Sequence, residues 1–244
     1  MQADNSTRDR VQLDRFYRSK DASSLMMRLA NFPDEVLPLL QLEMLAALSA
    51  LQCHACASVV EFGCYDGRSL EVTRLADVGY VGVDLDESGI ETLRKRILSE
   101  GLEGRARAVV ADVLEPEAWL PMVPAGLSLV HLPFNFVGGF RDVPHLLRSV
   151  CRVPEMLLLI TVFNTDDYTT SVRRRYYSAC GVRSLAHTHE AQTGVLFTGS
   201  MEFFSRALTL EALGRHLAEC GLQVLWRKTN RIGTCILARP NHFP

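Results

Sequence analysis

The chain has 244 residues, of which 48% are hydrophobic and 22% charged, values that fit one large globular α/β domain or one domain with a cap. The formal net charge of −2 gives no electrostatic reason to expect binding to nucleic acid or to an anionic membrane. No apolar run approaches the about 20 residues of a membrane-spanning helix. The polar N-terminus lacks a signal-peptide core, so we expect a cytoplasmic protein.

Residues 1–55 are expected to form an N-terminal helical arm or cap. Residues 1–24 are polar and contain the aromatic pair Phe16-Tyr17. A segment typical of a helix start precedes Leu37, and leucine and methionine then recur at helical spacing as far as Leu51. Apolar surface on this helix could serve a dimer or cover a sheet, so both a monomer and a homodimer are compatible with it.

Strand and helix patterns alternate along residues 56–163. Short apolar runs predict strands at 58–62, 80–84, 106–111, 127–132 and 155–163, and helical periodicity predicts helices at 69–77, 87–100 and 143–150. Such alternation implies a parallel sheet with right-handed crossover connections.

The alternation stops at residue 164. Residues 164–208 hold an arginine run, paired tyrosines and turn-rich polar stretches, and are expected to form a lid insertion. Residues 209–244 complete the core. Thr209 is the predicted N-cap of a helix that ends at Gly221. Two further strands, at 222–228 and 234–238, are predicted to form an antiparallel hairpin.

Two patterns invite a metal or redox interpretation. Cys53 and Cys56 form a C-x-x-C, but no second pair follows at zinc-binding spacing, so two small buried residues are the better interpretation. His187 and His189 would share one face of a strand, but no third ligand is evident. We therefore expect no metal site, and reduced thiols for the seven cysteines.

The most informative motif follows the first strand. A buried run from Val59 to Phe62 leads into Glu61-x-Gly63-x-Tyr65-x-Gly67, where glycines let bare backbone N–H groups approach a ligand. Acids end the next two strands, at Asp84 and Asp112. In open α/β sheets, ligands bind at this carboxyl edge of the strands.

This loop resembles motif I (E/D-x-G-x-G-x-G) of the small-molecule type of class I S-adenosylmethionine (SAM) dependent methyltransferases, and the resemblance covers about residues 56–238. It departs from the three-glycine fingerprint of dinucleotide-binding folds. Tyr65 replaces the usual central glycine, and its ring would cover cofactor or substrate. The resemblance implies a Rossmann-like, doubly wound, mostly parallel seven-stranded sheet with a terminal antiparallel hairpin, and it makes the lid at 164–208 a substrate-recognition insertion.

The resemblance also assigns cofactor contacts. Glu61 and the glycine loop would face the methionine part of SAM, Asp84 would bind the ribose hydroxyls, and Asp112 would accept from the adenine amino group. S-adenosylhomocysteine would be the product. The residues implied in cofactor binding are Tyr17, Glu61, Gly63, Cys64, Tyr65, Gly67, Asp84, Leu85, Asp112, Val113 and Pro133.

The segment after the fourth strand falls at motif IV of that family, where catalytic groups often lie. It lacks the N-P-P-Y/F sequence of amino-directed DNA and protein methyltransferases, because Asn135 follows Pro133 instead of preceding it. His131 is a candidate general base or an ordinary strand histidine with a satisfied hydrogen bond. Phe134 and Asn135 are candidate substrate contacts.

The run Arg173-Arg174-Arg175-Tyr176-Tyr177 supplies further candidates within the insertion. An inward arginine, for which we name Arg175, could clamp a carboxylate or phosphate. Tyr176 could relay a proton and Tyr177 could wall an aromatic substrate. The alternative is a solvated charged face with tyrosines packing beneath it.

The expected function is transfer of the SAM methyl group to an O, N or C atom of a small metabolite, and the resemblance suggests natural-product biosynthesis as its setting. The expected partner is a small-molecule methyl acceptor, with no nucleic acid and no membrane. Three alternatives stay open: a methyltransferase acting on RNA or protein, a Rossmann-type NAD-dependent oxidoreductase, and a SAM-binding protein without catalysis.

Overall fold

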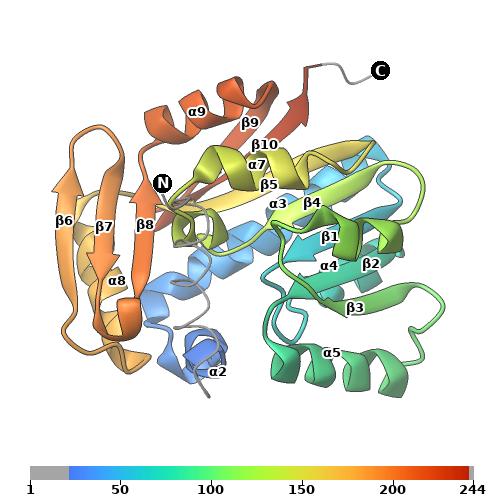
Figure 1. Cartoon of the computed structure of the whole chain (residues 1–244), viewed down its shortest axis with the longest axis horizontal. Coiled ribbons are helices and arrows are strands. Elements are labelled where there is room, and N and C mark those ends of the chain that lie inside the picture. Colours follow the sequence, from blue (N-terminus) through green and yellow to red (C-terminus); the bar gives the residue numbers. More distant parts are fainter. Residues whose placement is uncertain (1–21, 242–244) are drawn as a thin grey trace, which may run out of the picture.

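The computed structural model describes residues 22–241 as a seven-stranded sheet with helices on both faces and a smaller sheet at one end (Figure 1). The strand order is β3-β2-β1-β4-β5-β10-β9. Strands β1 to β5 are parallel, whereas β10 is antiparallel to β5 and β9. The predicted Rossmann-like sheet with its terminal hairpin is therefore confirmed. The strands are β1 (Ser58–Phe62), β2 (Gly79–Asp84), β3 (Ala106–Val110), β4 (Ser128–Leu132), β5 (Met156–Phe163), β9 (Leu222–Thr229) and β10 (Gly233–Pro240).

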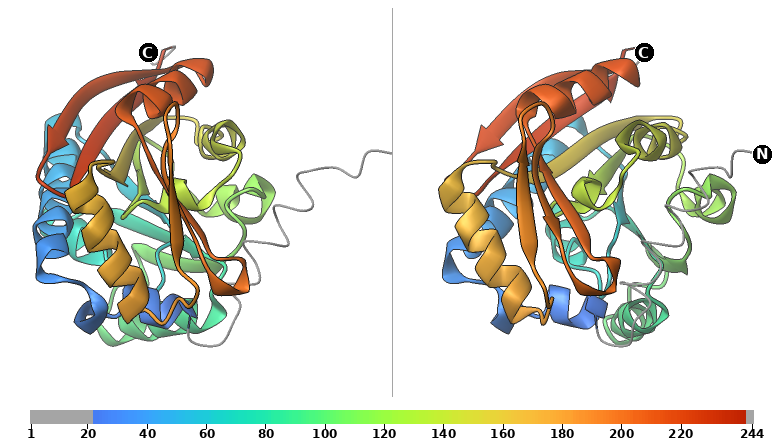
Figure 2. Two further views of the ribbon diagram at one scale, coloured as in Figure 1. Left: turned by 90° about the vertical axis from the view of Figure 1, so that its left-hand side faces the viewer. Right: turned by 60° about the vertical axis from the view of Figure 1, so that its left-hand side comes forward.

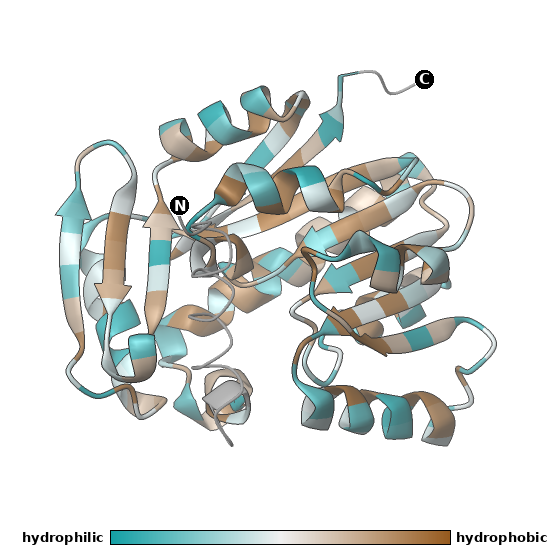
Figure 3. Ribbon diagram, in the orientation of Figure 1, coloured by the Kyte–Doolittle hydropathy of each residue, from teal (hydrophilic) through white to brown (hydrophobic). Residues whose placement is uncertain are grey.

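The sheet is covered on both faces, which explains its nearly continuous apolar strands. Val59 and Val60 are neighbours in β1 but belong to different hydrophobic clusters, because successive strand side chains point to opposite faces. Figure 3 shows hydrophobic residues concentrated along the central strands. One face carries α3 (Leu37–His54), α4 (Leu70–Ala76) and α5 (Glu87–Ser99), and the other carries α6 (Pro116–Trp119), α7 (Val143–Val150) and α9 (Leu210–Glu219).

Several helices begin at a side-chain cap, as their sequences indicate. Thr209 accepts a hydrogen bond from the N–H of Ala212 at the start of α9, which confirms the predicted N-cap. Asp86 and Asp142 cap α5 and α7 in the same manner. Short 3₁₀ turns complete the chain: η1 (Leu29–Asn31), η2 (Asp34–Val36), η3 (Leu120–Met122), η4 (Phe136–Gly139) and η5 (Ser200–Glu202).

The insertion after β5 folds into a helix and a separate three-stranded antiparallel sheet of order β6-β7-β8 (Figure 2). It shares a hydrophobic cluster with the N-terminal segment, in which Phe32 contacts Tyr176 at a ring separation of 5.0 Å. Its elements, with the N-terminal helix α2 (Ala22–Met27), are α8 (Asp167–Ala179), β6 (Ala186–Glu190), β7 (Gly194–Thr198) and β8 (Phe204–Leu208). The division of the chain at residues 55, 163 and 208 stays a proposal.

The expectation that no segment resembles a membrane-spanning helix needs correction. The helical stretch Asp34–His54 has 21 residues and a hydropathy of 1.5, which suffices to cross a membrane by length and composition alone. Packing explains part of this composition. Leu39, Ala47 and Leu51 are buried against the sheet and the insertion, as is the carboxylate of Glu43, at 2% exposure.

Candidate functional site

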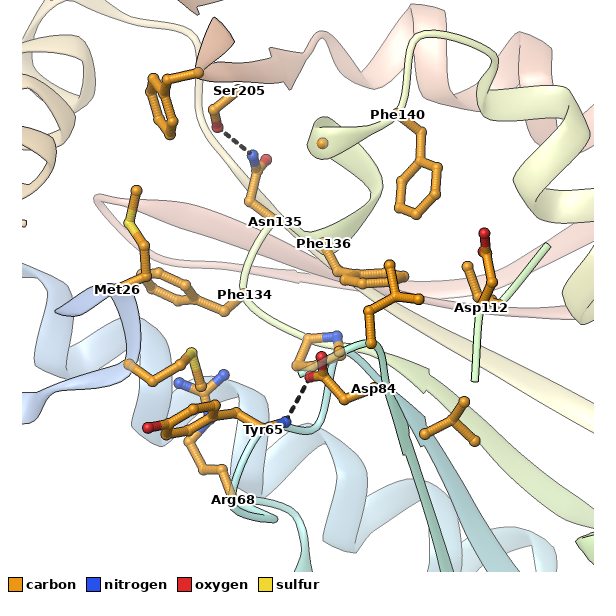
Figure 4. Close-up of a pocket in the computed structure, with 18 of the residues that line it drawn as sticks. Met26, Tyr65, Arg68, Asp84, Asp112, Phe134, Asn135, Phe136, Phe140 and Ser205 are labelled. Carbon is orange, nitrogen blue, oxygen red and sulfur yellow. Dashed lines mark hydrogen bonds between the residues drawn. The ribbon is translucent and has the colours of Figure 1, made fainter. Parts of the chain in front are cut away.

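A cavity lies at the carboxyl ends of the central strands and extends beneath the insertion (Figure 4). We call the part that follows β1, β2 and β3 the sheet-edge half; it is lined by Gly63, Tyr65, Arg68, Val83, Asp84, Leu85, Ala111, Asp112, Val113 and Leu114. We call the rest the aromatic half. It comes from α2, the loop after β4, the end of β5 and the insertion, and is lined by Met26, Met27, Pro133, Phe134, Asn135, Phe136, Gly139, Phe140, Phe163, Tyr176, Tyr177, Phe203 and Ser205.

The glycine loop after β1 needs its glycines for geometric reasons. Gly63 has φ +69°, and a Cβ there would lie 2.4 Å from the ring of Phe136. Gly67 has φ +84°, and a Cβ there would lie 2.4 Å from Leu93 on α5. Any side chain would therefore be strained in the backbone and would overlap a neighbour. The absence of a side chain at Gly63 lets the ring of Phe136, which lines the cavity, approach the backbone of the loop.

Tyr65 adopts the left-handed conformation usual for the glycine it replaces, with φ 47°. Its N–H donates to Asp84 Oδ2 at 2.7 Å. A Cβ at Gly89 would lie 2.6 Å from the Tyr65 ring, so the ring packs against the first turn of α5. The hydroxyl also interacts with Ser24 of α2. The tyrosine therefore connects the glycine loop to α5 and α2 while lining the cavity.

Asp84 and Asp112 lie at the same edge of the sheet, as predicted, and both line the cavity. Besides Tyr65, the N–H of Asp86 donates to the Asp84 carboxylate, at 2.9 Å. Burial raises the pKa of Asp84, although these two N–H donors act in the opposite direction. The N–H of Leu114 donates to Asp112 at 2.8 Å. Leu85, Val113 and Pro133 line the cavity as well.

Glu61 does not line the cavity but lies beneath the glycine loop, at 1% exposure. It accepts hydrogen bonds from Tyr80 Oη at 2.6 Å and Ser69 Oγ at 2.8 Å. Burial raises its pKa to about 7. The structure thus gives this acid a role in supporting the loop. Cys64 and Gly67 also lie outside the lining, and Tyr17 lies outside the described residues.

His131 is not brought to the cavity either. It is buried at 2% exposure, and its Nδ1 lies 2.9 Å from Ser69 Oγ. Its Nε2 is 3.9 Å from Glu43, too far for a hydrogen bond. Burial lowers the pKa of His131 to about 4, so the ring is neutral near pH 7. The geometry matches the alternative of a structural strand histidine better than a general base.

The residues of α8 that face inward differ in part from those that the sequence predicts. Arg175 is more than half exposed and pairs with Glu35 at 2.6 Å, outside the cavity. Tyr176 and Tyr177 line the cavity, and the Tyr176 hydroxyl donates to the carbonyl of Met26. The inward arginine is Arg173, which is fully buried.

Phe134 and Asn135, predicted as substrate contacts, both line the aromatic half. Asn135 is held by hydrogen bonds to the insertion and to β5, donating to the carbonyl of Arg206 at 3.0 Å. Sequence reasoning missed Met26, Phe203 and Ser205, which come from distant segments and carry no local signal. It also missed Phe136 and Phe140, which the aromatic spacing after Pro133 could have indicated.

Strand order, glycine turn and strand-end carboxylates together correspond to the class I methyltransferase fold. No family model matches the chain, and no curated protein matches its sequence. Among solved structures, the chain is similar to the 1,6-didemethyltoxoflavin-N1-methyltransferase of Burkholderia thailandensis with bound S-adenosylhomocysteine. The TM-score is 0.58, with 15% identity over 97% of this chain and 88% of that one.

Two further structures extend the comparison. The magnesium protoporphyrin IX methyltransferase of Synechocystis PCC 6803, with bound SAM, matches at TM-score 0.53 and 8% identity, over 82% of this chain and 79% of that one. The [4+2]-cyclase SpnF matches at TM-score 0.53 and 12% identity, over 81% of each chain. At such identities the likeness establishes the fold, which is that of the class I SAM-dependent methyltransferases.

Proposed function

We propose that the protein is a SAM-dependent methyltransferase acting on an O, N or C atom of a small molecule. The observation that carries this proposal is one continuous cavity with two chemically different halves. Its sheet-edge half combines a glycine turn with carboxylates at the ends of β2 and β3, and its aromatic half is mainly apolar and is bordered by α2 and the insertion. Methyl transfer between two small molecules requires such paired sites.

The sheet-edge residues fit the cofactor. Asp84 has two carboxylate oxygens in the cavity, each with capacity to accept a ribose hydroxyl beyond its backbone N–H. Asp112 would accept from the adenine amino group. The absent side chain of Gly63 leaves room for the methionine part, in a space that a Cβ would fill. When bound, SAM supplies a methyl group on a positively charged sulfur.

The aromatic half would orient the acceptor and exclude water. Ring faces attract cations, so Phe136, whose ring lies beside Gly63, suits a sulfonium, whereas the Phe134 ring already contacts the guanidinium of Arg68 at 5.4 Å. The acceptor lone pair would form the new bond to the methyl carbon while the carbon–sulfur pair returns to sulfur. Alignment of donor and acceptor then supplies most of the rate enhancement.

A small acceptor is favoured over RNA or protein by the position of the cavity between the sheet edge, α2 and the insertion, and by the net charge of −2. The matched structures named for methylation of a toxoflavin precursor and a porphyrin support the same class of acceptor. We propose biosynthesis of a small metabolite in the cytoplasm as the setting, by a monomer or homodimer.

The test is ligand binding followed by product detection. We expect SAM and S-adenosylhomocysteine to raise the melting temperature and to bind in calorimetry, and NAD to do neither. Stabilisation by NAD alone would contradict the proposal. Because SpnF is a cyclase with the same fold, transfer of a tritium-labelled methyl group from SAM to a candidate acceptor must be measured directly.

A further inference from the structure

A charged side chain lies buried directly behind the aromatic half. Arg173 has 0% exposure, and among residues 22–241 it forms no ion pair with a carboxylate. Its Nε donates to Tyr177 Oη at 3.3 Å, Nη1 donates to the carbonyl of Val195 at 3.2 Å, and Nη2 donates to the carbonyl of Ser205 at 3.0 Å. A buried charge without a counterion is costly, and here the three neutral acceptors share that compensation with the rings of Phe163, Tyr177 and Phe197, whose centroids lie 4.8–5.6 Å from the guanidinium.

Two of these partners, Tyr177 and Ser205, carry hydroxyl groups and line the cavity. Tyr177 Oη and Ser205 Oγ lie 2.7 Å apart, and both residues line the aromatic half. Arg173 Nη2 and Asn135 Nδ2 also approach Ser205 Oγ, each at 3.4 Å, and both can only donate.

The Tyr177–Ser205 pair has one more hydroxyl proton than its hydrogen bonds use. The two hydroxyls carry two protons, and their neighbours Arg173 and Asn135 offer them only donors. One proton is used between the two oxygens. The other has no acceptor among the described residues, and because both residues line the cavity, a bound ligand could accept it. The cluster is therefore a hydroxyl donor backed by a buried positive charge.

The rest of the aromatic half is lined by aromatic rings and holds neither of the two carboxylates that line the cavity. Around the hydroxyl pair lie the rings of Phe134, Phe163 and Phe203, and the carboxylates that line the cavity, Asp84 and Asp112, belong to the sheet-edge half. In the view of Figure 4, Ser205 lies on the opposite side of Phe134 and Phe136 from Asp84. A charge in such a low-dielectric environment acts strongly on a ligand.

We propose that Arg173, Tyr177 and Ser205 form the recognition site for a phenolate-type oxygen of the acceptor, an anionic oxygen conjugated to a planar ring. The aromatic walls would hold the ring, and the free hydroxyl proton would donate to the oxygen. This names the acceptor class and rests on the proposed function for the identity of the reaction, whereas binding of such a molecule can be measured without methyl transfer.

The test compares two fluorescent probes of nearly equal shape, 7-hydroxycoumarin and 7-methoxycoumarin, with and without S-adenosylhomocysteine. Binding is measured at a pH where the free hydroxy probe is half ionised, and absorbance reports the bound phenolate fraction. We expect the wild type to prefer the hydroxy probe and to bind it mainly as the phenolate. Because a hydrogen bond to a charged group is lost, Tyr177→Phe and Ser205→Ala should each lower that preference about tenfold.

The matched control is Tyr168→Phe, which removes a hydroxyl from the same helix, α8, but outside the cavity, where the ring contacts Arg231. Its preference between the probes should stay at the wild-type value. Equal affinity for both probes, an unchanged ratio in Tyr177→Phe and Ser205→Ala, or failure to bind either probe would each overturn the assignment. Failure of S-adenosylhomocysteine to bind would instead contradict the proposed function, while the probe ratio would still test the cluster.

Discussion

Replacement of Asp84 by alanine tests the sheet-edge half most directly. The carboxylate accepts N–H groups at 2.7 and 2.9 Å and retains lone pairs that face the cavity. Each hydrogen bond to a charged group contributes about 1.5–3 kcal/mol, so loss of two ribose contacts costs about 3–6 kcal/mol. At 1.4 kcal/mol per factor of ten, Asp84→Ala should weaken S-adenosylhomocysteine binding by about a hundredfold to ten-thousandfold.

The assay is titration calorimetry, with thermal unfolding as a check on the fold. Asp84→Ala also leaves the N–H groups of Tyr65 and Asp86 without their acceptor, so some loss of stability is expected. Asp142→Ala is the matched control, because it too removes a carboxylate that accepts a backbone N–H, but outside the cavity. If a folded Asp84→Ala protein binds S-adenosylhomocysteine within about threefold of the wild-type affinity, a difference of about 0.6 kcal/mol, the ribose assignment is refuted.

Three further predictions address the loop and the insertion. Burial raises the pKa of Glu61 from 4.5 to about 7 in the folded protein, so its contribution to stability is present below pH 4.5 and is lost as the pH rises through 7. Glu61→Gln should therefore reduce the change of melting temperature between pH 4.5 and pH 7. A pH profile identical to that of the wild type would contradict the raised pKa. Gly67→Ala should lower stability by about 2 kcal/mol or more in urea unfolding, from backbone strain and overlap with Leu93; no loss would show that the loop can relax. Arg175→Ala removes only an exposed pair with Glu35, so it should change stability by about 1 kcal/mol or less and leave ligand affinity unchanged; weaker acceptor binding would restore this residue to the site.

The sheet could be predicted because its information is local. Buried parallel strands are short apolar runs, and their carboxyl ends meet at one edge, so Asp84 and Asp112 could be brought together from spacing alone. The small sheet of the insertion could not be predicted in this way. Strand β6 (Ala186–Glu190) has no buried position, so it lacks the alternation that indicates a half-buried strand.

Side-chain direction limited the prediction of the site. The motif position of Glu61 predicts a ligand contact, yet its side chain points beneath the loop to Tyr80. On α8, the prediction of an inward Arg175 is wrong, because helical geometry directs another arginine inward. If Tyr176 and Tyr177 face inward, the arginine three and four residues before them shares their face, and that residue is Arg173. The contact between Ser205 and Tyr177 joins distant segments, which no local pattern indicates.

The division of the cavity between separate segments bears on how such a protein could diversify. Tyr177, Phe203 and Ser205 belong to the insertion, whereas the glycine loop and strand-end acids belong to the core sheet. Acceptor preference could therefore change through substitutions in the insertion alone. Phe134 is the constrained position, because its ring connects the aromatic half to Arg68 of the glycine loop, whose guanidinium lies 5.4 Å from the ring centroid. A library aimed at new acceptors should vary the insertion and keep that connection intact.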